Sequence, residues 1–413
     1  MKRTLSLFVL LAAFAHAQPD PVIAGSNRFA VNLYQQLANE DNLFFSPLSI
    51  SLALGMTYAG AAGETAAQMA DVLNVNNATD MADVLGSLSD DLETREGFTL
   101  NVANALWGQQ GRPFEPRFLL TARTDYGATL RNLDFQNASA EARNTINDWV
   151  ERETEGIIRD LLPANAITPD TRLVLTNAIY FNAAWQFPFS VNNTEDSPFT
   201  TLAGGQVRVP MMQQTRMFAY SRGDDYQTLQ LPYEGSSVSL LVVLPTAGRF
   251  AEVASQLETV LAEAMSGQQA ARVNLELPRF TVRSKSDLAT NLTRLGMLAA
   301  FTPYQPAADC EMADAGSDAG TGAGSDTGTG ADFSNMDGTR CLYIDAVIHE
   351  AYIDVDEVRT EAAAATAVAM ARTTSLNRQP PINFIVNRPF LFAIRDDVSG
   401  ALLFLGQVTD PTR

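Results

Sequence analysis

The stretch DEVRTEAAAATAVAMARTTS, residues 356–375, decides how the rest of the chain is interpreted. Its middle, residues 360–371, is mostly alanine with a few Thr, Val and Met residues, and intrinsic propensity alone favours a helix there. That helix would carry no long apolar side chains at helical spacing with which to pack against a core. An alanine-rich surface helix is the simplest interpretation of the stretch by itself, but it leaves the small side chains unexplained.

The composition excludes one class of partner. The chain has 413 residues, 46% of them hydrophobic, and a net charge of −19. That length and hydrophobic content suffice for one large domain or two ordinary ones. Binding to nucleic acid needs clustered Lys and Arg, and the sequence contains no basic run.

The N-terminus has the pattern of a secretory signal peptide. Lys2 and Arg3 precede an apolar stretch, and Ala15-His16-Ala17 forms a small-x-small cleavage site. The apolar stretch is too short to span a membrane, and no later stretch is long enough. We therefore expect residues 1–17 to be removed and the protein to be secreted, either extracellular or periplasmic, without a membrane anchor.

Few residues beyond the signal peptide could carry catalysis. Past residue 17 the chain has one histidine, His349, and two cysteines, Cys310 and Cys341. Sequence patterns of metalloproteases, serine hydrolases and phosphate-binding loops are absent. We expect no catalytic residue, no metal site and no cofactor. The two cysteines of an exported protein most simply form a disulfide, with two free thiols as the alternative.

Helix and strand signals both occur, which predicts an α+β fold. Helices are expected at residues 27–37, after Ser46-Pro47, where Leu48, Leu52 and Met56 mark one apolar face, and at 142–156. Strands are expected at 171–185, 237–245, 272–282, 389–396 and 401–408. The Gly- and Asp-rich segment 302–331 is expected to be a flexible insertion, since it lacks the spacing of a calcium loop.

Several segments in a fixed order resemble the serpin family. They are NLFFSPLSISLALGMTYAGA, INDWVERETEGIIRDLLP with LVLTNAIYFNAAWQFPF, ADFSNM, VIHEAYIDVDE, NRPFLFAIRD and LLFLGQV. The resemblance covers about residues 24–410. It implies a single serpin domain over 18–413, with about nine helices around three β-sheets and an exposed reactive-centre loop within 357–380.

The resemblance also implies a function. An inhibitory serpin offers its loop to a serine protease, forms a covalent acyl-enzyme and then inserts the loop as a new strand in its largest sheet. In a strand, Thr360, Ala362, Ala364 and Thr366 would lie on one face, and their small side chains suit entry into a closed sheet, because a bulky or charged side chain on that face would oppose burial. The implied partner is an elastase-like or trypsin-like serine protease in a covalent complex, and the protein is expected to be a monomer.

The hinge and the scissile bond are assigned from the family's E-x-G-T-E pattern. Glu357 matches its first residue. When Glu357 is counted as residue one, the seventeenth residue is Thr373, so the expected scissile bond is Thr373–Thr374. Arg372–Thr373, one residue earlier, remains an alternative that would suit a trypsin-like protease, and Arg378 is a third candidate. Arg359 stands where the pattern has glycine, which is expected to slow the movement of the loop. The hinge comprises Glu357, Arg359, Thr360, Glu361, Ala362, Ala363, Ala364, Ala365 and Thr366.

Further residues match positions that control sheet opening in the family. Trp185 matches the "breach", where insertion begins. The "shutter" beneath the sheet is matched by Ser46, Pro47, Ser49, Asn177 and His349. A satisfied buried histidine and a large core aromatic are the plain alternatives for His349 and Trp185. A non-inhibitory serpin-fold protein, serving as carrier, chaperone or storage protein, is the main rival function, and a secreted hydrolase is disfavoured by the single histidine.

Overall fold

The computed structural model describes residues 19–305 except 113, 128 and 236, then 329–360 and 380–413. The α+β expectation is confirmed for this part of the chain. Its α-helices are α1 (Pro21–Leu37), α2 (Pro47–Ala59), α3 (Gly63–Leu73), α4 (Ala78–Met81), α5 (Ser87–Thr94), α6 (Pro116–Thr124), α7 (Phe135–Glu153), α8 (Phe250–Ser255), α9 (Leu257–Ser266), α10 (Ala289–Leu295) and α12 (Ser334–Asp337). Without the single turns α4 and α12, nine α-helices are described, as expected. Shorter π and 3-10 segments are η1 (Ala82–Gly86), η2 (Val191–Asn193) and η3 (Ala299–Phe301).

The described strands form two sheets. They are β1 (Leu43–Phe45), β2 (Phe98–Gln109), β3 (Thr129–Leu133), β4 (Leu173–Ala184), β5 (Glu195–Thr200), β6 (Gln206–Arg222), β7 (Tyr226–Pro232), β8 (Val238–Pro245), β9 (Gln269–Pro278), β10 (Phe280–Asp287), β11 (Ala346–Val355), β12 (Arg359–Thr360), β13 (Ile382–Ile385), β14 (Phe390–Asp396) and β15 (Leu402–Val408). One sheet has the order β10-β11-β4-β2-β3, with β12 beside β4. The other has the order β1-β15-β14-β8-β7-β6-β9-β13, with β5 beside β6. Three sheets were expected, and two of them are continuous in the structure. The long strand β6 joins them, because it pairs with β7 on one side and with β9 and β5 along the rest of its length.

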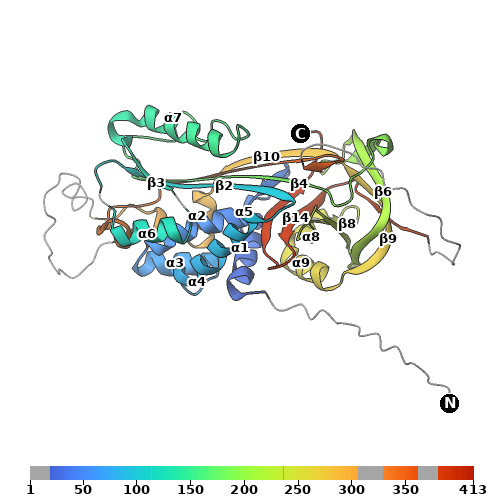
Figure 1. Cartoon of the computed structure of the whole chain (residues 1–413), viewed down its shortest axis with the longest axis horizontal. Helices are drawn as coiled ribbons and strands as arrows, with labels where there is room; N and C mark the ends of the chain where they lie inside the picture. Colours follow the sequence, from blue (N-terminus) through green and yellow to red (C-terminus); the bar gives the residue numbers. More distant parts are fainter. Residues whose placement is uncertain (1–18, 113, 128, 236, 306–328, 361–379) are drawn as a thin grey trace, which may run out of the picture.

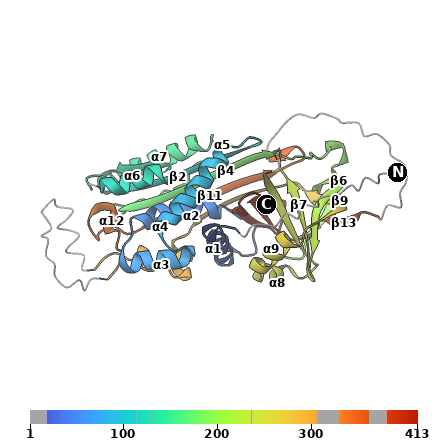
Figure 2. The ribbon, with the colours of Figure 1, turned by 60° about the horizontal axis from the view of Figure 1, so that its bottom comes forward.

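The sheet that contains β4 separates two hydrophobic layers. Figure 1 shows α7 alone over one face of this sheet, with α1 to α6 gathered on the other, and Figure 2 shows the same layers turned. A small cluster lies under α7 and includes Trp107, Ile146 and Trp149. The main core fills the opposite side and continues into the nine-stranded sheet. Strand β4 is buried along almost its whole length, which explains its continuous apolar sequence.

Two sequence-based expectations differ from the structure in detail. The helix that starts at Ser46 was expected to have one apolar face, but every residue from Pro47 to Tyr58 is buried. Small residues such as Ser49 and Ser51 allow this helix to pack on all sides. The expected strand 272–282 is two strands in different sheets, β9 and β10. Pro278 ends β9, and Arg279 carries the chain across to the other sheet.

The Gly- and Asp-rich segment leaves and rejoins the body at one point. Gln305 and Thr329 form an isolated antiparallel bridge, in which the Gln305 N–H donates to the Thr329 carbonyl at 2.8 Å. Residues 306–328 of the expected insertion lie outside the described residues. The two ends are therefore neighbours in space, as the insertion hypothesis requires.

The packing of α7 on the sheet yields a stability prediction. Ile146 is completely buried between α7 and the outer face of the sheet. Ile146→Ala should lower the free energy of unfolding by about 2–5 kcal/mol, because it leaves a cavity in a small cluster. Urea unfolding followed by tryptophan fluorescence measures this loss. The matched exposed change Thr145→Ala should cost less than about 0.5 kcal/mol, and equal losses would contradict the assignment.

Candidate functional site

The candidate site is the seam between strands β4 and β11 at the centre of the six-stranded sheet. The two strands pair in parallel over seven residue pairs, from Ala346 with Val174 to Tyr352 with Tyr180. Their other neighbours, β2 and β10, are both antiparallel. Parallel ladders are slightly less stable per residue than antiparallel ones, so the seam is the weakest ladder in the middle of this sheet.

The hinge residues begin to enter this seam at its open end. After β11 the chain turns, and β12 runs back antiparallel to β4, pairing Arg359 with Ala184 and Thr360 with Ala183. The backbone of Arg359 is extended, a conformation available to every residue. The starting position of the hinge therefore does not require the glycine that the family pattern has there. A strand that continued from β12 along the seam would be antiparallel to both β4 and β11.

Trp185 holds the turn between β11 and β12. Its indole N–H donates to the carbonyl of Asp356 at 2.9 Å, and its backbone N–H donates to the carbonyl of Val358 at 3.2 Å. The ring is 3% exposed and stacks on Tyr233, with centroids 4.7 Å apart. Trp185, the residue matched to the breach, thus contacts the chain on either side of Glu357 through hydrogen bonds.

A buried ion pair fixes the first residue of the hinge. The Glu357 side chain is 3% exposed, and one of its oxygens accepts a hydrogen bond from Arg279 Nε at 2.7 Å. Arg279 Nη2 and Thr194 Oγ1 bind the other oxygen. Burial works to raise the pKa of Glu357, but the hydrogen bonds from Arg279 and Thr194 outweigh it, so the pKa lies below its usual value. Sequence reasoning missed Arg279 and Thr194, which are distant in the chain.

The predicted shutter residues meet under the middle of the seam. His349 on β11 is 1% exposed; its Nε2 accepts a hydrogen bond from the Ser46 N–H at 3.2 Å, so its Nδ1 donates to Asn177 Oδ1 on β4. The Asn177 amide donates to Ser49 Oγ. Burial lowers the pKa of His349 to about 3, against a weaker opposing effect of its hydrogen bond to Asn177. The imidazole is therefore neutral, with a fixed tautomer.

Helix α2 supplies the lower half of the shutter. Ser46 caps the helix by accepting a hydrogen bond from the Ser49 N–H at 3.2 Å, and its hydroxyl donates to the Leu403 carbonyl at 2.7 Å. Pro47 occupies the first turn, where its missing N–H has no cost. Asn104 on β2 joins the cluster through Asn177 and Ser49. Sequence reasoning missed Asn104, because only the pairing of β2 with β4 places it beside Asn177.

Several predicted site residues cannot be placed. Glu361, Ala362, Ala363, Ala364, Ala365, Thr366, Arg372, Thr373 and Thr374 lie outside the described residues. Cys341 takes part in a disulfide, and the other cysteine of the sequence, Cys310, also lies outside them. The predicted signal peptide, residues 1–17, is outside them too.

Among the described residues there is neither a metal centre nor a membrane span. Across the described ranges, no group of three or more His, Cys, Asp and Glu residues could hold a metal ion. Within the same ranges, no helix is long and apolar enough to cross a bilayer.

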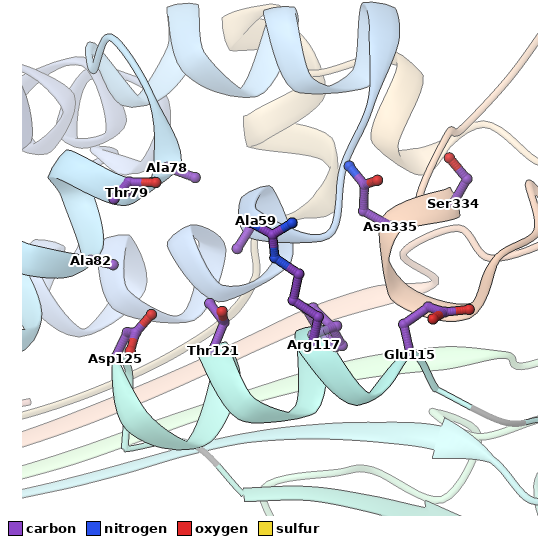
Figure 3. Close-up of a pocket in the computed structure, with 11 residues that line it drawn as sticks. Ala59, Ala78, Thr79, Ala82, Glu115, Arg117, Thr121, Asp125, Ser334 and Asn335 are labelled. Carbon is purple, nitrogen blue, oxygen red and sulfur yellow. The ribbon is translucent and has the colours of Figure 1, made fainter.

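A separate cavity lies at the other end of the molecule. It has a volume of about 490 Å³ and lies between α2, α4, α6 and α12. Arg117 points into it from α6, Thr121 lies further along the same helix, Asp125 directly follows the helix, and Asn335 lies opposite (Figure 3). A cavity of this size and polarity could hold a small polar molecule. It shares no residue with the seam or the hinge.

Comparison with known proteins agrees with this geometry. Residues 24–411 match the family described as Serpin (serine protease inhibitor). An uncharacterised serpin-like protein of Thermococcus kodakarensis is 36% identical over 95% of this chain and 87% of its own. The human leukocyte elastase inhibitor is 34% identical over 95% of this chain and 100% of its own. Human thyroxine-binding globulin, solved with its hormone, superposes with a TM-score of 0.80 at 27% identity over 95% and 99% of the two chains. The expected fold class is confirmed.

The buried histidine predicts how stability depends on pH. The folded-state pKa of His349 is about 3, whereas an unfolded histidine titrates near 6.5. The contribution of His349 to the free energy of unfolding is therefore at its maximum above pH 6.5. It falls by up to about 1.4 kcal/mol per pH unit as the pH drops from 6.5 towards 3. In His349→Gln, which can still donate and accept, unfolding curves between pH 6.5 and 4 should show a shallower slope than wild type. An unchanged slope would exclude His349 as its source.

The hinge ion pair predicts a coupling between Glu357 and Arg279. Because the pKa of Glu357 is lowered, its contribution is present at neutral pH and is lost as the pH falls below its ordinary value of 4.5. Glu357→Gln should cost about 1 kcal/mol at pH 7, a modest value since Arg279 is partly exposed. A double-mutant cycle with Arg279→Met measures the coupling, and Arg272→Met serves as the exposed control. A coupling energy of zero would contradict the pairing.

Proposed function

The chain belongs to the serpin family, and we propose that it inhibits serine proteases by a suicide-substrate mechanism. The single observation that carries the proposal is β12, whose pairing with β4 starts a strand at the head of the seam. The alanine-rich residues that follow it in the sequence are small enough to continue that strand into the sheet.

The chemistry is supplied by the protease and stopped by the inhibitor. The protease serine attacks the carbonyl of the scissile bond, expels the new amino terminus of the C-terminal fragment and remains as an ester of the loop. The loop then leaves the surface and enters the seam, carrying the acylated protease with it. Deacylation needs an ordered active site with a positioned water, and distortion of that site leaves the ester in place.

The free energy that would drive insertion of the loop comes from new strand pairing in the six-stranded sheet. Insertion would replace one parallel ladder of seven residue pairs with two antiparallel ladders. Both the number of hydrogen bonds and the stability per pair would rise. Residues 360–371 in an extended conformation span roughly 40 Å, so a long new ladder is available. The protein as described therefore holds a sheet that can gain stability by accepting a strand.

The loop sequence supports two target classes. Cleavage at Thr373–Thr374 would place a small residue in the specificity pocket of an elastase-like protease. Cleavage at Arg372–Thr373 would suit a trypsin-like protease, whose pocket ends in a carboxylate. The relation to leukocyte elastase inhibitors favours the first bond. We further propose that the protein acts outside the cytoplasm as a monomer, after removal of residues 1–17.

A carrier function is the second candidate. It is favoured by one observation, the structural likeness to thyroxine-binding globulin, which was solved with thyroxine bound. In that case the loop need not insert at all. Cleavage of the loop would then leave the melting temperature unchanged, whereas an inserting loop should raise it sharply.

A gel assay with two proteases tests the proposed function. We expect complexes with neutrophil-type elastase or trypsin that survive boiling in detergent, because the acyl ester is covalent. N-terminal sequencing of the released fragment identifies the bond: a start at Thr374 assigns Thr373–Thr374, and a start at Thr373 assigns Arg372–Thr373. Arg372→Ala should reduce trypsin complexes by at least about tenfold if Arg372 is recognised.

The matched control for that assay is Arg378→Ala, which removes a nearby arginine of the same loop sequence and should leave both complexes unchanged. Clean cleavage of the loop without any boiling-resistant complex, by either protease, would overturn the inhibitory proposal for these two classes.

A further inference from the structure

The cavity between α2, α4, α6 and α12 has walls that the fold itself holds in place. The Glu115 N–H, just before α6, donates to the carbonyl of Met336 in α12 at 2.7 Å. At the other end of α6, the hydroxyl of Tyr126 donates to the carbonyl of Ala78 in α4 at 3.2 Å. Helix α6 is thus tied to both facing walls, and the cavity exists before any ligand enters, as in most small-molecule sites.

The end of α2 closes the cavity from behind with close packing. A Cβ at Gly60 would lie 2.2 Å from the Met336 side chain and 3.1 Å from the Phe118 ring, so a residue without a side chain is needed there. The Asn335 side-chain amide donates to the carbonyl of Ala61 at 2.9 Å. This bond uses the nitrogen of Asn335 and leaves its Oδ1 as an acceptor among the residues that line the cavity.

Helix α6 presents a cation, a hydroxyl and a carboxylate to the cavity in one row. Arg117, Thr121 and Asp125 are spaced four residues apart, which places them on the same side of a helix. Asp125 follows the helix but keeps near-helical backbone angles, φ −102° and ψ −21°, so the row continues past the helix end. Figure 3 shows these three side chains on the cavity side of α6, with the Arg117 guanidinium pointing inward.

The two charges at the ends of this row are not neutralised by neighbours. No hydrogen bond or ion pair joins Arg117 to another residue in the described part of the chain. The Asp125 carboxylate accepts a hydrogen bond from the hydroxyl of Thr124, which carries no charge. Glu115, the other carboxylate of the lining, lies beside α12, where its Oε1 would be 3.2 Å from a Cβ at Gly338. Arg117 and Asp125 are therefore both available to a charged ligand.

The charges of the lining select one class of ligand. Among the described residues that line the cavity, Arg117 is the only cation, and Glu115 and Asp125 are the carboxylates. An anion would be attracted by Arg117 but repelled by the carboxylates, and a cation would meet the reverse. A zwitterion with its carboxylate on Arg117 and its ammonium group on Asp125 forms a charge-assisted hydrogen bond at each end.

The distance between the two charges sets the length of that zwitterion. Eight residues with a rise of 1.5 Å place the Cα atoms of Arg117 and Asp125 roughly 12 Å apart along the helix axis. A charge-assisted contact of about 2.8 Å at each end leaves roughly 6 Å for the ligand. An extended dipeptide spans about 7 Å, whereas a single α-amino acid is about half as long. The cavity volume of about 490 Å³ also leaves room for the side chains of a dipeptide.

We propose that this cavity binds a dipeptide, with its C-terminal carboxylate on Arg117, its N-terminal ammonium group on Asp125 and its peptide bond between Thr121 and Asn335. The Thr121 hydroxyl is a donor for the peptide carbonyl, and Asn335 Oδ1 is an acceptor for the peptide N–H. This binding site goes beyond the proposed inhibition of proteases and does not depend on it, because the cavity shares no residue with the seam or the hinge.

Calorimetric titration of the full protein with glycylglycine tests the site. We expect saturable binding with a Kd of about 1 mM or tighter, which is reasonable for a ligand of this size. Glycylglycinamide lacks the carboxylate and N-acetylglycylglycine lacks the ammonium group, so each should bind at least about tenfold more weakly. The ligand 5-aminopentanoate has the same chain length and end charges but no peptide bond, and it should bind at least about threefold more weakly.

Two variants assign the two ends of the ligand. Arg117→Met should remove the preference for glycylglycine over glycylglycinamide and keep the preference over N-acetylglycylglycine, and Asp125→Asn should do the reverse. Damage to the whole cavity would weaken both preferences together, so each variant controls for the other. The matched control Arg123→Met removes an arginine from the last turn of α6 that does not line the cavity. It should leave every affinity within about twofold of wild type.

Three results would overturn the inference. The first is the absence of saturable binding up to about 20 mM glycylglycine. The second is binding whose preferences are unchanged in both variants, because a dipeptide held elsewhere would not respond to Arg117 or Asp125. The third is equal affinity for 5-aminopentanoate, which would show that the peptide bond is not recognised. None of these results bears on the covalent complex with a protease, which judges the proposed function separately.

Discussion

The parallel ladder between β4 and β11 is the constraint on which the rest of the structure depends. Each strand is antiparallel to its other neighbour, so the parallel pair is the one central ladder that an additional antiparallel strand could improve. The proposed function requires this ladder to be closed before the chain meets a protease and open afterwards. The polar groups at the seam can be understood as the means of holding it closed.

Three groups hold the seam at different points along its length and on both faces. At its head, Trp185 and the Glu357–Arg279 pair hold the turn from which the hinge starts. In its middle, His349 and Asn177 join β11 to β4 from the core side. On the outer side, Asn101 of β2 and Lys285 of β10 both hydrogen-bond to the segment that follows α7, at Glu155 and Asp160. Each of these three groups holds the seam with polar contacts. Losing a polar contact costs free energy only until its donor and acceptor find other partners, which suits the single rearrangement that the proposed function requires.

Much of the fold and part of the site could be predicted from the sequence. The continuous apolar run of β4, the Ser46-Pro47 start of α2 and the order of segments identified the fold class and placed His349, Asn177 and Ser46 together. Arg279, Thr194 and Asn104 were missed, because each reaches the site through a register that no local pattern specifies. The split of residues 272–282 between two sheets was missed for the same reason, since a proline in an apolar run does not reveal that the chain changes sheets.

By itself, the sequence determined the serpin fold, the alanine-rich composition of residues 360–371 and the candidates for cleavage, because these depend on residue type and order. Only the tertiary structure decided which ladder is parallel, which arginine pairs with Glu357 and which residues meet under the seam. Those features depend on contacts between residues far apart in the chain, 78 positions for Arg279 with Glu357 and 172 for Asn177 with His349. Local propensity carries no information about such contacts, since they form only when the whole sheet is assembled.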